Sequence, residues 1–353
     1  MFNKKRENAR VVRAFGGSLK ASLPKGLRYV AFTMAEILLS LTIIGVVAAI
    51  TLPSLTGNIN ERTWNTQRKA LYSRLSQAIA LMPQIRGYGM EVDDSLYAQN
   101  DVMPKATITF LTNGLSKVMK LNNVCDESAL GDCGIPNEVV NLKGGKTPLA
   151  TSAWTMTSYY RPFEYVGCGL NKPVYTYAAA FETQNGESVL VHYNPYCNDE
   201  ATALNHNWRM APVAVFCANF IYDLNGKKGP NTVGKDIGVM GLLYPSNSVL
   251  VSVQPSPKDY SGSAAFSRSS AVSVCKNSGD DLRLPNKEEA IVMAVNYELF
   301  QIEGNYWTAS PTSSLLTSRM GYVSYHYIDM QRDYAMVETA SASSAYKVRC
   351  IKR

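Results

Sequence analysis

Histidine, cysteine and acidic side chains are the residues of this 353-residue chain that could carry catalysis or bind a metal ion. The chain has only three histidines, His192, His206 and His326, and no C-x-x-C pair, which argues against a zinc site. No nucleophile, base and orienting group can be assembled from its His, Cys and Asp residues. The sequence therefore argues against an enzyme.

A loop rich in Asp, Asn and Gly, D-L-N-G-K-K-G-P-N-T-V-G-K-D, runs from Asp223 to Asp236. Asp223 and Asn225 are placed as at the start of an EF-hand calcium loop. The remainder departs from that pattern, because Lys227 stands at a ligand position and the bidentate glutamate is absent. These offsets favour a turn-rich loop without metal. If calcium does bind, the candidate oxygen donors are Asp223, Asn225, Asn231 and Asp236.

An apolar run extends from Phe32 to Leu52 and contains one charged residue, Glu36. Its 21 residues are enough to cross a bilayer, which takes about 20. A cleaved secretory signal fits less well, since its apolar region is about 7–15 residues long. A carboxylate within membrane depth is unfavourable, so Glu36 either lies in water at the interface or pairs with a group of another subunit.

Positive charge is concentrated ahead of the apolar run. Eight of the 35 basic residues and one of the 28 acidic residues lie in residues 1–31, so the remaining 27 of each sign cancel. A basic flank stays in the cytoplasm, which predicts that the rest of the chain is translocated. The neutral remainder argues against a nucleic-acid-binding protein, which needs a basic surface.

The segment V-A-F-T-M-A-E-I-L-L-S-L-T-I-I-G-V-V-A-A-I-T-L-P, residues 30–53, resembles the processing and methylation motif of type IV prepilins and type II secretion pseudopilins. The resemblance implies that a prepilin peptidase cuts between Ala31 and Phe32 and that the new amine of Phe32 is methylated. It also implies that Glu36 pairs with the amine of a neighbouring subunit and that Pro53 kinks the helix. Ala31 departs from the family, which usually has glycine before the cut, and the leader is unusually long.

The same resemblance implies partners and a location. The other pilin subunits and an inner-membrane assembly platform would be the partners. The chain would lie in the bacterial inner membrane before assembly and then in a periplasmic or cell-surface filament, with its globular part outside the cytoplasm. Loops similar to residues 223–236 recur in pilin-like proteins, some of which bind calcium.

A long helix and a β-rich region are the elements that must position these residues. After Pro53, apolar residues recur at helical spacing and predict an amphipathic face made of Trp64, Leu71, Leu75, Ala78, Ile79 and Met82. Gly87 and Gly89 are predicted to end this helix. Strands are predicted over residues 174–183, 187–193, 212–222 and 242–253, with Asn185-Gly186 as a hairpin turn.

Residues 254–270 are rich in Pro, Ser and Gly and are predicted to be a linker. Beyond them, Asn286 is predicted to cap a helix. The order of Cys275, L-R-L-P, this helix, Y-W-T-A-S and V-R-C resembles the C-type-lectin-like fold shared with formylglycine-generating enzymes. That resemblance implies a Cys275–Cys350 disulfide. Trp307 is predicted to be a core residue rather than a platform for a ligand. The calcium tripeptides of sugar-binding lectins and the paired cysteines of those enzymes are absent.

The remaining five cysteines follow the apolar run and would lie in an oxidising compartment. Cys125 and Cys133 can close a short loop. Cys168 and Cys197 flank the predicted hairpin and could approach each other. Cys217 lies in the middle of a predicted strand and is predicted to be the unpaired cysteine, buried as a small apolar residue.

These patterns predict an α+β protein with a long N-terminal helix packed on an antiparallel β-sheet, plus a C-terminal C-type-lectin-like domain. The predicted divisions are a leader (1–31), the long helix (32–90) with a transmembrane half (32–52), a β-rich domain (91–253), a linker (254–270) and the lectin-like domain (271–353). Two functions remain open. One is a minor type IV pilin-like subunit whose C-terminal domain binds a surface ligand in adhesion. The other is a membrane-anchored lectin-like surface protein that does not polymerise. Glu36 favours the first, because a plain anchor has no use for a carboxylate.

Overall fold

The computed structural model describes residues 33–85, 102–103, 106–149, 175–176, 178–193, 216–243, 250–260, 266–279, 281–302, 304–311, 324–329, 336–341 and 344–352. Within the first of these ranges, the side chains of residues 48, 50–60 and 83–85 lie outside the description. The chain divides into two compact units, Met1–Gly57 and Asn58–Arg353.

The first unit contains the beginning of helix α1 (Met34–Ile85), which has 52 residues in all. Its described apolar side chains are exposed, with fractional exposures from 46% to 78%. They are Met34, Ile37, Leu38, Leu39, Leu41, Ile43, Ile44, Val46 and Val47. Apolar side chains are therefore exposed on every side of this described start of α1.

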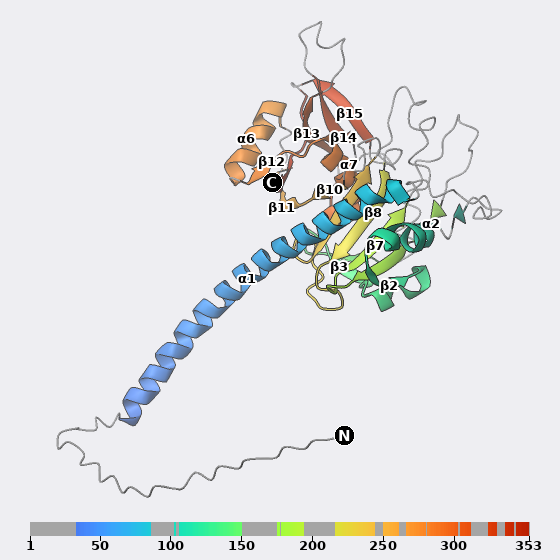
Figure 1. Ribbon diagram of the computed structural model, residues 1–353. Helices are drawn as coiled ribbons and strands as arrows, with labels where there is room; N and C mark the ends of the chain where they lie inside the picture. Colours follow the sequence, from blue (N-terminus) through green and yellow to red (C-terminus); the bar gives the residue numbers. More distant parts are fainter. Residues whose placement is uncertain are drawn as a thin grey trace, which may run out of the picture. The chain divides into compact units, whose positions relative to one another are not determined.

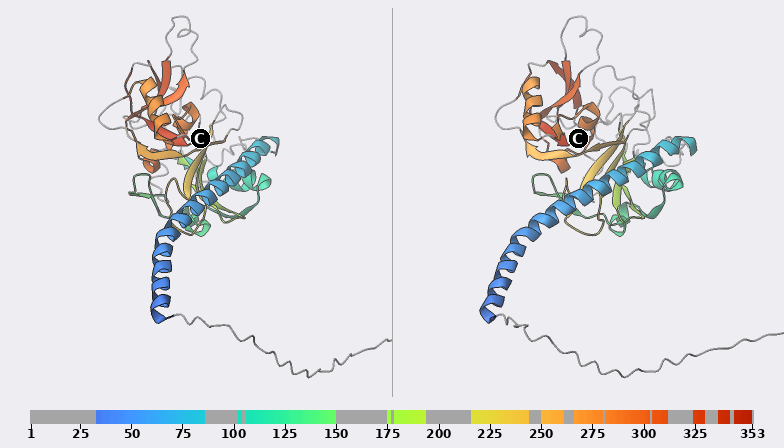
Figure 2. Two further views of the ribbon diagram at one scale, coloured as in Figure 1. Left: turned by 90° about the vertical axis from the view of Figure 1, so that its left-hand side faces the viewer. Right: turned by 60° about the vertical axis from the view of Figure 1, so that its left-hand side comes forward.

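The second unit is built around a six-stranded antiparallel sheet in the order β10-β9-β8-β7-β6-β2 (Figures 1 and 2). Its strands are β2 (Leu121–Cys125), β6 (Ala179–Thr183), β7 (Ser188–Tyr193), β8 (Phe216–Asp223), β9 (Ile237–Leu243) and β10 (Leu250–Val253). The predicted hairpin is confirmed, because β6 pairs with β7 and Gly186 takes a left-handed φ of 84° at the turn. The coarse fold class, α+β with an antiparallel sheet, is therefore confirmed.

Both faces of the sheet are buried. Alternate residues of each strand point to opposite faces, and each face belongs to its own apolar cluster. Val189 and Val191 of β7 belong to one apolar cluster, while Leu190 between them belongs to another. The first cluster includes the second half of α1, which crosses the sheet (Figure 2). The predicted helix face is confirmed, since it packs in this cluster through Trp64, Leu71, Leu75, Ala78, Ile79 and Met82.

A helical segment that the sequence interpretation missed joins the same cluster. It consists of α2 (Ala106–Thr109), the π-helix η2 (Phe110–Leu115) and α3 (Ser116–Val118). Phe110, Leu111 and Leu115 are fully buried in it. The prediction that residues 90–250 are mainly strands and loops is wrong here. Leu111 and Leu115 are four residues apart, as on one face of a helix, but the β-branched Thr and Ile residues around them are typical of strands.

Four short strands and one helical turn complete this part. They are β1 (Val102–Met103) paired with β5 (Tyr175–Thr176), β3 (Glu138–Val140) paired with β4 (Lys146–Pro148), and the 3₁₀-helix η3 (Glu127–Cys133). Asp126 caps η3 by accepting a hydrogen bond from the Ser128 N–H at 3.0 Å.

In its described residues, the C-terminal part has three short helices and two three-stranded sheets. The helices are α6 (Arg268–Ser278), α7 (Lys287–Val295) and α8 (Tyr297–Phe300). One sheet has the order β11-β16-β12 and the other β13-β14-β15. Their strands are β11 (Pro255–Asp259), β12 (Leu282–Arg283), β13 (Asn305–Pro311), β14 (Ser324–Asp329), β15 (Met336–Ser341) and β16 (Arg349–Lys352).

The predicted linker over residues 254–270 is wrong, because it contains β11, which pairs with the C-terminal strand β16. Pro255 and Pro257 are typical of loops, but β11 is an edge strand, where proline is tolerated. The predicted cap is confirmed: the Asn286 side chain accepts from the Glu289 N–H, and the Glu289 carboxylate accepts from the Asn286 N–H.

Helix α7 covers the second face of the six-stranded sheet, so the C-terminal part is not a separate body. Its residues Ala290–Val295 share one apolar cluster with Leu190, Ile221 and Val239 of the sheet. The buried side chains of Asn219 in β8 and Asn296 after α7 exchange two amide hydrogen bonds of 3.0 and 3.1 Å. Residues 58–353 thus form one unit, and the predicted boundary at residue 253 falls inside its core.

Candidate functional site

The segment around the predicted cleavage point begins the described part of the chain. Ala31 and Phe32 lie outside the described residues, as does the side chain of Pro53. Thr33 and Glu36 form a capping box at the start of α1. The Glu36 Oε2 accepts from the Thr33 N–H at 2.9 Å and from the Thr33 hydroxyl at 3.0 Å, and the Thr33 hydroxyl oxygen accepts from the Glu36 N–H at 3.3 Å.

The capping box fixes how the Glu36 carboxylate is presented. Both hydrogen bonds to the carboxylate end on Oε2. Oε1 accepts none from the described residues, and the side chain is exposed. The helix start therefore orients one carboxylate oxygen internally and leaves the other available to a partner.

A second candidate site is the loop from Asp223 to Asp236, where the structure brings the predicted oxygen donors together. Asp236 is fully buried, and its two oxygens accept from the backbone N–H groups of Asn231 (2.8 Å) and Thr232 (2.7 Å). Asp223 accepts from the Asn225 N–H at 3.1 Å. Asn231 has a left-handed φ of 49°. With its side-chain amide oriented so that the nitrogen faces Asp223, Asn231 donates to Asp223 Oδ2 at 3.3 Å.

The electrostatics of this loop favour a proton on Asp223. Burial and, to a smaller extent, the nearby Asp236 charge raise the pKa of Asp223 to about 7, against the lowering effect of the Asn225 and Gly226 N–H groups. Within the described ranges, no group of three or more His, Cys, Asp or Glu side chains could hold a metal ion. The loop's own hydrogen bonds favour a turn-rich structural loop, and calcium binding there stays a prediction.

Two of the predicted disulfides are present. Cys125 bonds to Cys133 across η3, and Cys275 bonds to Cys350, joining α6 to β16. The prediction that Cys217 is unpaired is wrong, because Cys217 is also disulfide-bonded. Its partner lies outside the described residues, as do Cys168 and Cys197 and their predicted pairing. A position in the middle of a strand favours burial, and Cys217 is buried, but that position does not reveal a disulfide partner.

The C-terminal residues that carried the lectin-like resemblance lie in a small core around the Cys275–Cys350 bond. Trp307 is fully buried there, donates from Nε1 to the Phe266 carbonyl at 2.7 Å and meets the Tyr346 ring edge-on. Trp307 is thus a core residue, as expected, and not part of a ligand platform.

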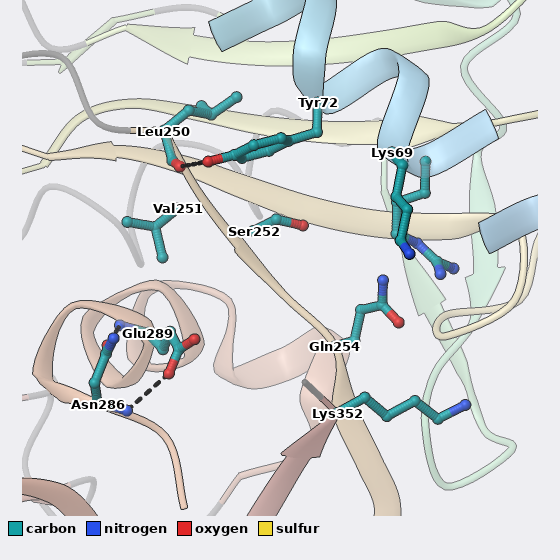
Figure 3. Close-up of a pocket in the computed structure, with 10 residues that line it drawn as sticks. Lys69, Tyr72, Leu250, Val251, Ser252, Gln254, Asn286, Glu289 and Lys352 are labelled. Atoms are coloured by element: carbon teal, nitrogen blue, oxygen red, sulfur yellow. Dashed lines mark hydrogen bonds between the residues drawn. The ribbon is translucent and has the colours of Figure 1, made fainter. Parts of the chain in front are cut away.

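An open cavity of about 390 Å³, which we call the α1–β10 pocket, lies among α1, β10, the start of α7 and the end of β16 (Figure 3). Its polar lining includes Arg68, Lys69, Ser252, Gln254 and Lys352. Local sequence patterns do not indicate this pocket, because its residues come from elements far apart in the chain.

A scan against protein-family models, a search of curated proteins and a search of solved structures each found nothing similar to this chain. In the described part of the chain, no helix is both long enough and apolar enough to span a membrane.

Proposed function

We propose that this chain is a type IV pilin-like subunit that is cleaved by a prepilin peptidase, held in the bacterial inner membrane and assembled through α1 into a pilus or pseudopilus. One observation carries the proposal. Helix α1 begins with an apolar, exposed segment bearing a single carboxylate, and its later residues form an amphipathic face that packs on an antiparallel sheet.

The exposed apolar side chains at the start of α1 explain why such a subunit would polymerise. Leu38, Leu41 and Ile44 are each more than half exposed. The sequence run from Phe32 to Leu52 has the length of a membrane span, which supports lipid as the first environment. In a filament, the same segments of neighbouring subunits would cover one another, as in a helix bundle.

Glu36 supplies the specificity of this assembly. In the proposed filament, its free oxygen Oε1 accepts a hydrogen bond from the N-terminal amine of the next subunit. Both charges lose water there, and each is tolerated because the other is present. Thr33 supports the arrangement by holding Oε2, so that the carboxylate does not have to be ordered during assembly.

Mass spectrometry of the mature N-terminus tests the processing step. We expect a chain that begins at Phe32 and carries a methyl group on its amine. A chain that begins at Ala49, as after signal-peptidase cleavage, or one that keeps its leader, would contradict the proposal.

The assembly step is tested with Glu36→Ala, expressed together with the other filament subunits. We expect the variant to be inserted and cleaved normally but to be largely lost from the sheared filament fraction. Thr42→Ala is a matched control, since its hydroxyl only returns to the Leu38 carbonyl at 2.8 Å on the same helix. Equal incorporation of Glu36→Ala and wild type would favour the alternative, a membrane-anchored surface binding protein that does not polymerise.

A further inference from the structure

The α1–β10 pocket contains a buried positive charge without a counterion. Arg68 is 4% exposed and uses its guanidinium to donate to the Tyr222 hydroxyl (3.0 Å), the Asn65 side-chain oxygen (2.6 Å) and the Lys235 carbonyl (2.8 Å). All three acceptors are neutral. No carboxylate in the described part of the chain lies within ion-pair distance of Arg68, and an isolated buried charge is unfavourable unless it is compensated.

Two lysines add to this charge at the mouth of the pocket. Lys69 follows Arg68 on α1 and is exposed, and Lys352 ends β16. Figure 3 shows both side chains on the same side of the pocket, with the Gln254 amide between them. Lys352 Nζ already binds one carboxylate, that of the exposed Glu61, at 3.0 Å.

The carboxylate that lines the pocket cannot neutralise these cations. Glu289 makes a two-pronged ion pair with Arg283, with distances of 2.6 and 2.7 Å, and also accepts from the Asn286 N–H at 2.8 Å. Its charge is therefore committed to α7 and its cap. One end of the pocket is left with three cations, Arg68, Lys69 and Lys352, and in the described part of the chain the one carboxylate that pairs with any of them is Glu61, on Lys352.

We propose that the α1–β10 pocket binds a small organic carboxylate. The carboxylate lies between Lys69 and Lys352, over the buried Arg68, and competes with Glu61 for Lys352. Hydroxyl groups of the ligand meet the Gln254 amide and the Ser252 hydroxyl, and its carbon skeleton lies against Tyr72, whose own hydroxyl is used by the Leu250 carbonyl at 2.9 Å. The volume of about 390 Å³ is within the usual range for such ligands. A hydroxylated carboxylate such as a sugar acid satisfies these groups.

Isothermal titration of the full chain in detergent tests the proposal, with glucuronate as the probe, glucose as its uncharged counterpart and phosphate at equal ionic strength as a second anion. We expect saturable binding of glucuronate only. Binding of glucose to the same extent, binding of phosphate as tight as that of glucuronate, or no saturable heat with glucuronate would each overturn the proposal.

Three charge variants locate the site. We expect Lys69→Gln to weaken glucuronate binding by about tenfold, since a hydrogen bond to a charged group is lost. Glu61→Gln should tighten it by several-fold, because the competing carboxylate is gone. Lys276→Gln on α6 makes the same charge change at an exposed position outside the pocket and should leave binding unchanged. Equal affinities for wild type and Lys69→Gln would place any binding elsewhere.

Discussion

The two faces of the six-stranded sheet are covered by helices of different character. Helix α1 is amphipathic where it packs, with Leu71 and Leu75 buried against the sheet and Arg62 and Lys69 exposed on the other side. Helix α7 is buried from Glu289 to Val295, because it also meets the sheet β13-β14-β15 on its far side. In a surface helix, apolar residues recur with a 3.6-residue period and so indicate which face is buried. A helix between two layers is apolar on all sides, and its sequence has no such period.

The largest effect is expected from removing the second of these covers. A chain that ends at residue 253 lacks α7 and would expose Leu190, Ile221 and Val239 to water. We expect it to aggregate, as measured by size-exclusion chromatography and circular dichroism. A soluble monomer with an intact sheet would show that the C-terminal part is a separable domain after all.

The cover provided by α1 is tested by Leu75→Ala. Leu75 is fully buried, so the cavity left behind should lower the free energy of unfolding by about 2–5 kcal/mol. Leu41→Ala makes the same change where the side chain is 61% exposed, and should leave unfolding unchanged. Chemical denaturation in detergent measures both. Equal losses would mean that the start of α1 is also packed within the subunit.

The amide pair between β8 and the end of α7 should have a smaller effect. Asn296→Ala removes both hydrogen bonds to Asn219 in a buried place, so we expect a loss of about 1–3 kcal/mol in unfolding free energy. A double-mutant cycle with Asn219→Ala isolates the pair. Additive losses, without coupling, would show that the two side chains contribute independently.

The smallest expected effect is the pH dependence of the unfolding free energy that comes from His192, on the α7 face of the sheet. Burial lowers the pKa of His192 to about 4, whereas the unfolded chain has a value near 6.5. The unfolded state therefore binds a proton first as the pH falls below about 6.5, and stability decreases down to about pH 4. At pH 6 the loss should be about 1 kcal/mol relative to pH 7.5. His192→Gln should remove this part of the pH dependence, and an unchanged slope would assign it to other groups.

The elements with strong local patterns could be predicted from the sequence. The packed face of α1, the turn at Gly186 and the Asn286 cap each depend on residues close together in the chain. The shared core was not predicted. The apolar sequence of α7 indicates a buried helix but not which sheet covers it, and Pro255 and Pro257 are more typical of a loop than of the edge strand that contains them.

The candidate sites follow the same division. Asp223 and Asp236 could be found because one loop carries both, and Glu36 because it interrupts an apolar run. The α1–β10 pocket could not, since Arg68, Gln254 and Lys352 are joined only by the folded sheet. The bonding of Cys217 likewise depends on tertiary proximity, which spacing alone does not reveal.

The two outer strands of the six-stranded sheet are both occupied. At β10, the Tyr72 hydroxyl donates to the Leu250 carbonyl. This strand has four residues, and residues of α1 and α7 lie beside it. At β2, the Cys125–Cys133 bond folds η3 back beside the strand end. Exposed strand edges are the usual route to uncontrolled edge-to-edge association. In the filament that we propose, the sheet edges would therefore not compete with α1 as the route by which subunits associate.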